Sequence, residues 1–387
     1  MKYDFNTIPN RQNSGSLKWD FQSEHKNAFP FSVADMEWKT APQIIEAMKD
    51  FASSGYFCYT VADDAYKTVI KEFMLRRHNW QIENEWIVCT GGVVAAINTA
   101  VRAFTKIGEG VIIQPPVYYP FSNAINNNGR KIAANPLIKK DNTYVMDFDG
   151  LERLAAKEEN KLMLLCSPHN PVGRVWTKDE LERVADICLQ NNVVLVSDEI
   201  HFDITRTPHT CLPAISKEYA DNCVVCTAVS KTFNIAGLGT SNIIIPNHSV
   251  RNVFEKQLAA DGYTCINCCS RPATIAAYTQ CDDWIDEMNE CVNKNFELLG
   301  HFCKENLPQI RLYNREGTYL AWLDMSALGM NDEELEQFLI NKCGIIPDPG
   351  YWFGDEGKGF MRLDIAVPEN ALMQALQTLH TELSKIQ

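Results

Sequence analysis

The sequence predicts an α/β protein built on a mostly parallel sheet. Short apolar runs rich in β-branched residues alternate with helical patterns through the middle of the chain. The runs expected to be strands are 111–114, 162–166, 193–197, 223–227 and 242–245. Between two of them Thr177 begins a helix, because Glu180 follows three residues later and completes a capping box. Buried strands separated by amphipathic helices are typical of a parallel sheet covered on both faces.

The pattern changes near residue 285. Long helical stretches follow at 284–306 and 332–343, with strand-like runs at 318–324 and 360–365. A chain of 387 residues is long enough for about two structural units. We therefore expect an N-terminal arm that joins the small domain (1–46), a large domain (47–285) and a small α+β domain (286–387).

Composition excludes several classes of partner. The net charge is −13, and no block of consecutive basic residues occurs, so nucleic acid or an anionic membrane is not expected as the main partner. Residues 1–16 are polar, and the apolar runs are far shorter than the roughly 20 residues that span a bilayer. Fourteen cysteines without an export signal indicate reduced thiols in a cytoplasmic protein.

Two CxxC spacings raise the question of zinc. They are Cys223/Cys226 and Cys265/Cys268. The first pair lies in a run that is expected to be a strand. Residues three apart on a strand point to opposite faces, so these two cysteines do not readily coordinate one ion. We expect no metal in this protein.

Polar residues follow four of the expected strands. The segments are 115–119, 167–173, 198–201 and 230–234. In parallel α/β sheets, ligands bind beyond the carboxyl ends of the strands. The four segments therefore predict one shared ligand site.

Lys231 and Asp198 carry the most distinctive chemistry in these segments. Small and apolar residues flank Lys231 in Ala-Val-Ser-Lys-Thr-Phe-Asn, which predicts a desolvated, nucleophilic amine. A surface lysine in a loop is the alternative. Asp198 ends an apolar strand, where a carboxylate needs a cation or a donor such as a pyridinium N–H. A helix cap or an arginine partner is the alternative there.

Four further positions suit ligand binding. Asn170 stands between two prolines at a strand end, and Gly91-Gly92 precede a helix whose first N–H groups suit a phosphate. Tyr118 follows a strand and has a ring that could stack on a flat ligand. Arg362 alternates with apolar residues on a strand, which would direct its guanidinium to one face, where it could bind a carboxylate. An ordinary turn, an ordinary loop, a core aromatic and a surface salt bridge are the respective alternatives.

Taken together in this order, the motifs resemble one family, the fold-type-I pyridoxal phosphate (PLP) enzymes of the aminotransferase class I/II superfamily. Within it the chain is similar to the carbon–sulfur lyase branch, which contains cystathionine β-lyases and a maltose-regulon modulator. The matching segments are 33–38, 92–97, 114–121, 170–173, 197–201, 230–238, 316–324 and 359–366. They span nearly the whole chain.

The resemblance implies a role for each residue around the cofactor ring. Lys231 would be the Schiff-base lysine, and Asp198 the partner of the pyridine nitrogen. Asn170 would reach the phenolic oxygen, with His201 near that edge. Tyr118 would stack on the ring.

The same carry-over places the substrate and the phosphate. Arg362 would hold the substrate carboxylate. Gly92 and Val93 would offer backbone N–H groups to the phosphate, with Ser230 nearby. Tyr59 would reach the phosphate of a neighbouring subunit, so the resemblance implies a homodimer with shared active sites.

Some positions depart from the family's pattern. Many aminotransferases carry a serine and an arginine on the phosphate where this chain has Ala228 and Gly239, which argues against an aspartate-type aminotransferase. The branch usually has Asn where Asp364 stands, and Glu37-Trp38 replaces the commoner Asp-Phe. These changes bear on the phosphate contacts and on substrate preference.

The expected activity is β-elimination from cystathionine or a related cysteine thioether, which yields a thiol, pyruvate and ammonia. An amino-acid aminotransferase is the alternative enzyme. A regulator that acts through a protein partner is the non-enzymatic alternative, because the branch includes one such modulator.

Overall fold

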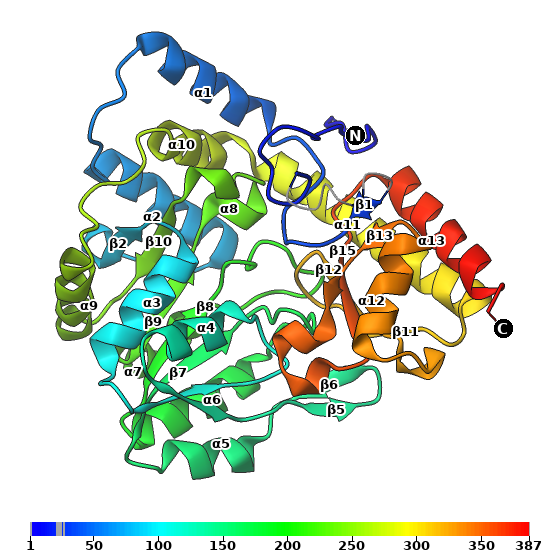
Figure 1. Ribbon diagram of the computed structural model, residues 1–387. Helices are drawn as coiled ribbons and strands as arrows, with labels where there is room; N and C mark the ends of the chain where they lie inside the picture. Colours follow the sequence, from blue (N-terminus) through cyan, green and yellow to red (C-terminus); the bar gives the residue numbers. More distant parts are fainter. Residues whose placement is uncertain (1, 21–24, 26–27, 387) are drawn as a thin grey trace.

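A seven-stranded sheet forms the centre of the protein, in a computed structural model that describes residues 2–20, 25 and 28–386. The strand order is β2 (Ile87–Thr90), β10 (Ser241–Ile244), β9 (Cys223–Thr227), β8 (Val194–Asp198), β7 (Asn160–Cys166), β3 (Gly110–Ile113) and β4 (Lys131–Ala134). Neighbours from β9 to β4 are parallel, whereas β10 runs antiparallel to both of its neighbours. The predicted mostly parallel α/β sheet is confirmed (Figure 1).

Helices bury apolar side chains on both faces of this sheet. On one face lie α3 (Val93–Phe104), α4 (Pro120–Asn127) and α9 (His248–Ala260). A second, larger core takes in α2 (Asp64–His78), α5 (Phe148–Ala155), α6 (Lys178–Gln190) and α10 (Ser270–Gln280). Cys223 belongs to the larger core and Cys226 to the smaller one. These two thiols therefore point to opposite faces, as the strand period predicted.

The expected capping box fixes the start of α6. The Thr177 side chain accepts a hydrogen bond from the Glu180 N–H, and the Glu180 carboxylate accepts one from the Thr177 N–H. Leu181, Val184 and Cys188 form the buried face of the helix. The observed strands differ from the predicted runs by one or two residues at some ends.

A four-stranded antiparallel sheet forms the centre of the C-terminal part. Its order is β11 (Arg311–Leu312), β12 (Leu320–Asp324), β15 (Phe360–Asp364) and β14 (Asp348–Pro349). The helices beside it are α11 (Asp282–Asn306), α12 (Asp332–Asn341) and α13 (Glu369–Leu383). Near the N-terminus, β1 (Phe29–Pro30) pairs in parallel with β13 (Ile345–Ile346). The α+β elements expected after residue 285 are present, while the division at residues 46 and 285 stays a prediction.

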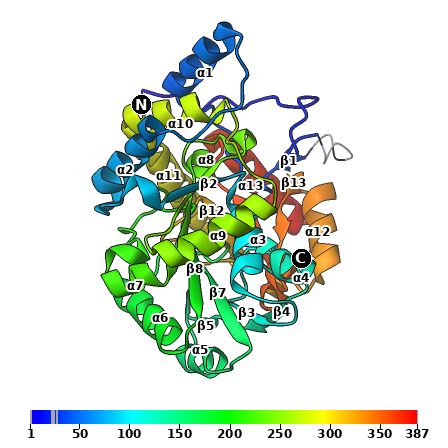
Figure 2. The ribbon, with the colours of Figure 1, turned by 90° about the vertical axis from the view of Figure 1, so that its left-hand side faces the viewer.

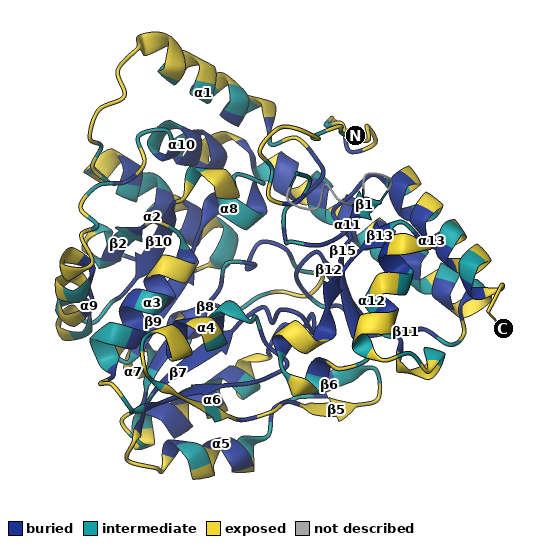
Figure 3. Cartoon of the chain, viewed as in Figure 1, coloured by how far each residue is buried: buried dark blue, intermediate teal, exposed yellow. Residues whose placement is uncertain are grey.

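Helix α1 (Pro42–Ser54) projects from the rest of the molecule, as Figures 1 and 2 show from two sides. Figure 3 shows that most of α1 is exposed and that the central strands are buried. The remaining strands and α-helices of the described chain are β5 (Ile138–Lys140), β6 (Thr143–Val145), α7 (Lys217–Asp221) and α8 (Val229–Thr232). No helix in the described part of the chain combines the length and the apolar character needed to cross a membrane.

Candidate active site

The four polar segments predicted to converge follow strands that are neighbours in the sheet. Strands β9, β8, β7 and β3 lie side by side and run in the same direction. Asp198 pairs with Cys166 on one side and with Cys226 on the other. The segments after these strands therefore meet at one edge of the sheet, where α/β proteins bind ligands.

Lys231 lies in α8, directly after β9. Its Nζ donates a hydrogen bond to the carbonyl oxygen of Ala34 at 2.5 Å. Burial lowers the pKa of the Lys231 amine below its usual value, while the nearby Asp35 carboxylate opposes this shift. A desolvated amine with a lowered pKa can serve as a nucleophile and as a base.

Asp198 is a buried carboxylate, 3% exposed, at the carboxyl end of β8. Its Oδ1 accepts one hydrogen bond from the Ile200 N–H at 3.2 Å. Burial raises the pKa of Asp198 to about 7. Among the described residues no lysine or arginine forms an ion pair with it, and no helix begins between it and Leu212, so neither predicted alternative, an arginine partner or a helix cap, is present.

His201 and Tyr118 lie close to these groups. His201 is buried, and its Nδ1 has no hydrogen-bond partner within the described part of the chain. Burial, together with the positive charges of Lys231 and Arg362, lowers the pKa of His201 well below its usual value, so the ring is neutral. Tyr118 packs beside the smaller core, and its N–H donates to the Asn170 carbonyl at 3.1 Å.

Arg362 is buried in β15 and is held on two sides. Its Nη1 donates to the Asn170 Oδ1 at 2.8 Å, so the structure brings these two predicted residues together. Its Nε donates to the Asp348 Oδ2 at 3.0 Å, and its Nη2 donates to the same oxygen. An Arg has five N–H donors. One proton on each of Nη1 and Nη2 remains for a carboxylate.

The residues predicted for a phosphate follow strands on either side of β10. Thr90 pairs with Ser241, and Thr227 pairs with Asn242, so the ends of β2 and β9 flank the start of β10. Two strand spacings separate them by about 10 Å. Gly92 precedes α3 at φ 116°, and no side chain in the described part of the chain caps the first turn. Such an uncapped helix start attracts anions.

These features fit PLP. The Asp198 carboxylate has room for another donor, which a protonated pyridine nitrogen would provide. The unpartnered His201 nitrogen and the Asn170 amide suit the polar edge of the ring. The uncapped start of α3 at Val93, with Ser230 in α8, suits a phosphate.

Sequence reasoning missed two members of this site. Asp348 is a buried acid in a two-residue strand, and it also accepts hydrogen bonds from the Val33 N–H. The Ala34 carbonyl accepts from Lys231 and from the Tyr319 hydroxyl, the latter at 2.9 Å. A backbone carbonyl leaves no signal in a sequence. Asp348, between two prolines in Ile-Pro-Asp-Pro-Gly, resembles an ordinary turn residue.

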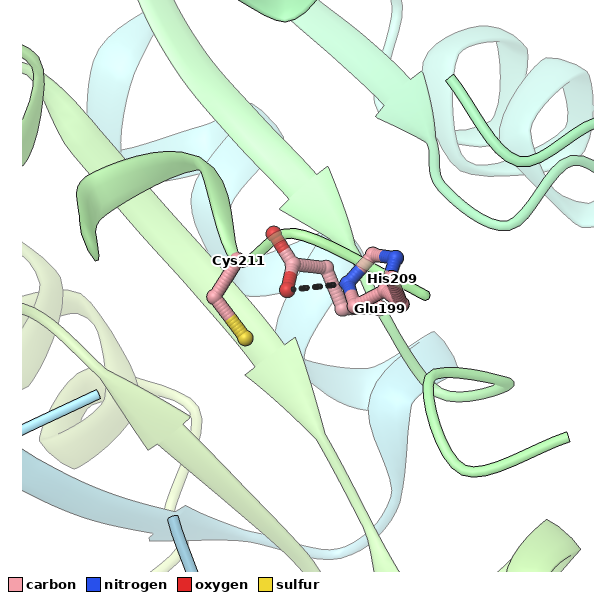
Figure 4. Close-up of side chains that lie close together, drawn as sticks. All are labelled: Glu199, His209 and Cys211. Atoms are coloured by element: carbon pink, nitrogen blue, oxygen red, sulfur yellow. Dashed lines mark hydrogen bonds and ion pairs between the residues drawn. The ribbon is translucent and has the colours of Figure 1, made fainter. Parts of the chain in front are cut away.

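Glu199, His209 and Cys211 form a separate buried cluster (Figure 4). One potential ligand atom from each lies within 4.8 Å of the others, which is the arrangement of a potential metal site. His209 Nε2 donates to Glu199 Oε2 at 2.9 Å, while Ser197 Oγ and the Leu212 N–H donate to Oε1 at 2.9 and 3.3 Å. Both carboxylate oxygens thus have donors, and we interpret the cluster as a structural network.

Tyr59 lies away from protein contacts, with 96% of its surface exposed, in the segment between α1 and α2. Tyr56, Phe57 and Val61 of the same segment are also exposed. The contact predicted for Tyr59 involves a second subunit and stays a prediction.

A half-buried lysine and a buried aspartate at the carboxyl edge of this sheet are the features of a PLP-dependent α/β enzyme. The family model for aminotransferase class I and II matches residues 26–379. The chain belongs to this family.

Three proteins show where in the family the chain falls. It is 38% identical to the cystathionine beta-lyase PatB of Bacillus subtilis, over 98% of this chain and 100% of that protein. The crystal structure of cystalysin from Treponema denticola, which contains a PLP cofactor, matches with a TM-score of 0.98 and 43% identity over 100% of both chains. A PLP-bound C–S lyase from Staphylococcus hominis matches with a TM-score of 0.92 and 30% identity over 99% of this chain and 98% of that one.

Proposed function

We propose that this protein is a PLP-dependent carbon–sulfur β-lyase that cleaves L-cystathionine or a related cysteine thioether. The observation that carries the proposal is the half-buried Lys231 amine, which acts electrostatically on the under-partnered Asp198 carboxylate. The likeness to PatB, to cystalysin and to a C–S lyase supports the lyase branch over other activities of the family.

Three residues would carry the reaction. Arg362 would bind the substrate carboxylate through the protons that Asp348 and Asn170 leave free. That contact orients the Cα–H bond towards the Lys231 amine, which removes the proton as a general base. Asp198 would keep a proton on the pyridine nitrogen, because the ionised carboxylate gains a donor there.

PLP, when bound, supplies an electron sink that stabilises negative charge developing at Cα. The proton from Cα goes to Lys231, and the Cβ–S bond breaks with its electron pair leaving on sulfur as a thiolate. Protonation of that thiolate gives the thiol. Consumption of one water molecule then gives pyruvate and ammonia, so that atoms balance across the reaction.

The remaining predicted contacts are part of the same proposal. Asn170 and His201 would bind the phenolic edge of the ring, and Tyr118 would stack on its face. The N–H groups of Gly92 and Val93, with the Ser230 hydroxyl, would bind the phosphate.

We further propose that two copies of the chain form the working enzyme. The exposed apolar side chains of Tyr56, Phe57, Tyr59 and Val61 are a surface that a second copy would cover. Tyr59 would then reach the phosphate of the neighbouring subunit. Size-exclusion chromatography with light scattering checks this part, and a monomer at micromolar concentration would contradict it.

The test of the activity is a visible spectrum followed by an assay. We expect a yellow protein that releases pyruvate and free thiol in equal amounts from L-cystathionine with no keto acid present. A protein that does not react with L-cystathionine until a keto acid is added would be an aminotransferase instead. A colourless protein that PLP cannot reconstitute would contradict the whole proposal.

A further inference from the structure

The Ala34 carbonyl that accepts from Lys231 belongs to a constrained stretch of backbone. Val33, the preceding residue, has φ 55°, in the left-handed region that β-branched residues rarely adopt. Such a conformation persists only where the surroundings hold it in place. The contacts that hold residues 33–37 therefore also determine where the Ala34 oxygen lies relative to the Lys231 amine.

Lys18 supplies the central contact of this stretch. Its side chain is fully buried, which is rare for a lysine unless its charge is paired. Its Nζ donates to the Asp35 carbonyl oxygen at 2.6 Å and to the Asp364 Oδ2 at 2.9 Å. It also forms an ion pair with the Glu37 Oε1 at 3.1 Å. The ammonium thus joins residues 35 and 37 to β15.

Neighbouring residues of the N-terminal segment reinforce these contacts. Arg11 forms ion pairs with Asp35 at 3.1 Å and with Glu37 at 3.6 Å. The Trp19 Nε1 donates to the Glu37 Oε2 at 2.9 Å. Residues 11–19 therefore hold the backbone immediately after Ala34, although none of them contacts Lys231 directly.

We propose that Lys18 is a positioning residue for Lys231, because its buried ammonium fixes residues 35–37 to β15 and thereby holds the Ala34 carbonyl against the Lys231 amine. This inference deepens the proposed function, in which Lys231 takes up and returns a proton as a free amine. The carbonyl stabilises the protonated amine through a charge-assisted hydrogen bond. A displaced carbonyl no longer does so.

Other charged groups also face the Lys231 amine, and the test has to separate them from Lys18. They come from the Ala34–Glu37 stretch, from the end of β8 and from β15: Asp35, Asp198, Arg362 and Asp364. His201 is close as well but is neutral. A variant that removes only the Lys18 charge would alter the field at Lys231 as well as the position of Ala34.

The double variant Lys18→Met/Asp364→Asn removes one positive and one negative charge and so leaves the net charge of the cluster unchanged. It also removes the charge of Asp364, and Glu37 keeps its contacts with Arg11 and Trp19, which is the reason to expect folding where Lys18→Met alone fails. Lys2→Met, at an exposed lysine paired with Asp283, is the matched control.

The primary measurement is trace acetylation of the full chain freed of its cofactor, followed over a range of pH by mass spectrometry of the Lys231 peptide. This gives the pKa of the Lys231 amine without any turnover. Asp364→Asn alone is the reference for this measurement, because the Asp364 carboxylate itself raises the pKa of Lys231. We expect the double variant to have a Lys231 pKa about one unit lower than that of Asp364→Asn, since a hydrogen bond to a charged group is lost. Loss of the Lys18 charge alone would shift the pKa in the opposite direction. In the holoenzyme, the acid limb of the kcat profile should move to lower pH by a similar amount.

A double variant whose thermal midpoint falls while its Lys231 labelling profile matches that of Asp364→Asn would overturn the proposal, because Lys18 would then be structural only. An unchanged midpoint and an unchanged profile would overturn it as well. A shifted labelling profile in a protein without lyase activity would uphold the role of Lys18 and reject the proposed function, so the two failures are distinguishable.

Discussion

Asp198 and Glu199 are consecutive buried carboxylates with very different surroundings. Asp198 accepts a single hydrogen bond from the described residues, at 3.2 Å from the Ile200 N–H. Glu199, which is fully buried, accepts from a hydroxyl, a backbone N–H and an imidazole, and Figure 4 shows the imidazole contact. One carboxylate has room for a ligand, and the other is already satisfied by the protein.

The difference shows how to separate a binding site from a structural network. A buried charge without donors is unfavourable unless a partner arrives, whereas a buried charge with three donors is stable by itself. Asp198 and Glu199 are both buried carboxylates, so neither burial nor acidity identifies the site. The count of donors does.

The largest expected effect concerns the group that reacts beside Asp198. Lys231→Ala should abolish lyase turnover and the yellow colour, because alanine has no amine to form the imine with PLP. Circular dichroism and the thermal midpoint should change little, since α8 tolerates alanine well. Retained turnover in this variant would reject the assignment of the whole site.

Asp198→Asn should come next. An amide does not hold a proton on the pyridine nitrogen, so kcat should fall roughly 100- to 1,000-fold. The protein should nevertheless remain as stable as the parent in its cofactor-free form, because the buried charge is removed. Assays at saturating PLP check the expected loss of kcat, and unfolding of the cofactor-free form checks the expected stability. A variant with full activity would mean that Asp198 has only a structural role.

Glu199→Ala should show the opposite pattern. Its loss leaves Ser197, His209 and Leu212 without their acceptor, and the free energy of unfolding should fall by about 3 kcal/mol. Turnover per folded molecule should stay close to that of the parent. Glu199→Gln, which keeps an acceptor, is the milder control. Equal losses of stability and of turnover would mean that the two carboxylates are not separate in function.

The smallest effect is on the pH dependence of stability. The folded-state pKa of Asp198 is raised to about 7 from 3.8, so between these values the folded chain keeps a proton that the unfolded chain has lost. The stability of the cofactor-free protein should therefore fall as pH rises through this window. The thermal midpoint should drop by a few degrees more in the parent than in Asp198→Asn, and parallel curves would contradict the raised pKa.

The sequence predicted the sheet and the ends of its strands because these depend on local patterns. Apolar, β-branched runs located β7, β8 and β9 to within two residues, and the capping box located the start of α6. The convergence of four strand ends followed from the parallel arrangement alone. Roles such as that of Asn170 came from resemblance to a family.

The contacts between distant segments could not be predicted in this way. Lys18 and Asp364 are 346 positions apart, and no periodicity relates them. Asp364 stood out only as a departure from the pattern of the family, and its buried lysine partner explains how the fold accepts the extra charge. The pairing of Asp348 with Arg362 was hidden for a similar reason, because both side chains look ordinary until β14 and β15 lie together.

The Lys18–Asp364 pair also has a consequence for synthesis. A ribosome releases Lys18 early, but its buried partner emerges only after nearly the whole chain has been made. Until then the ammonium has only Glu37 and the Asp35 carbonyl as partners, and the β15 side of the cluster around Lys231 is missing. A nascent chain can therefore complete its large sheet long before it can enclose the amine, and premature attachment of an aldehyde there would meet an unfinished pocket.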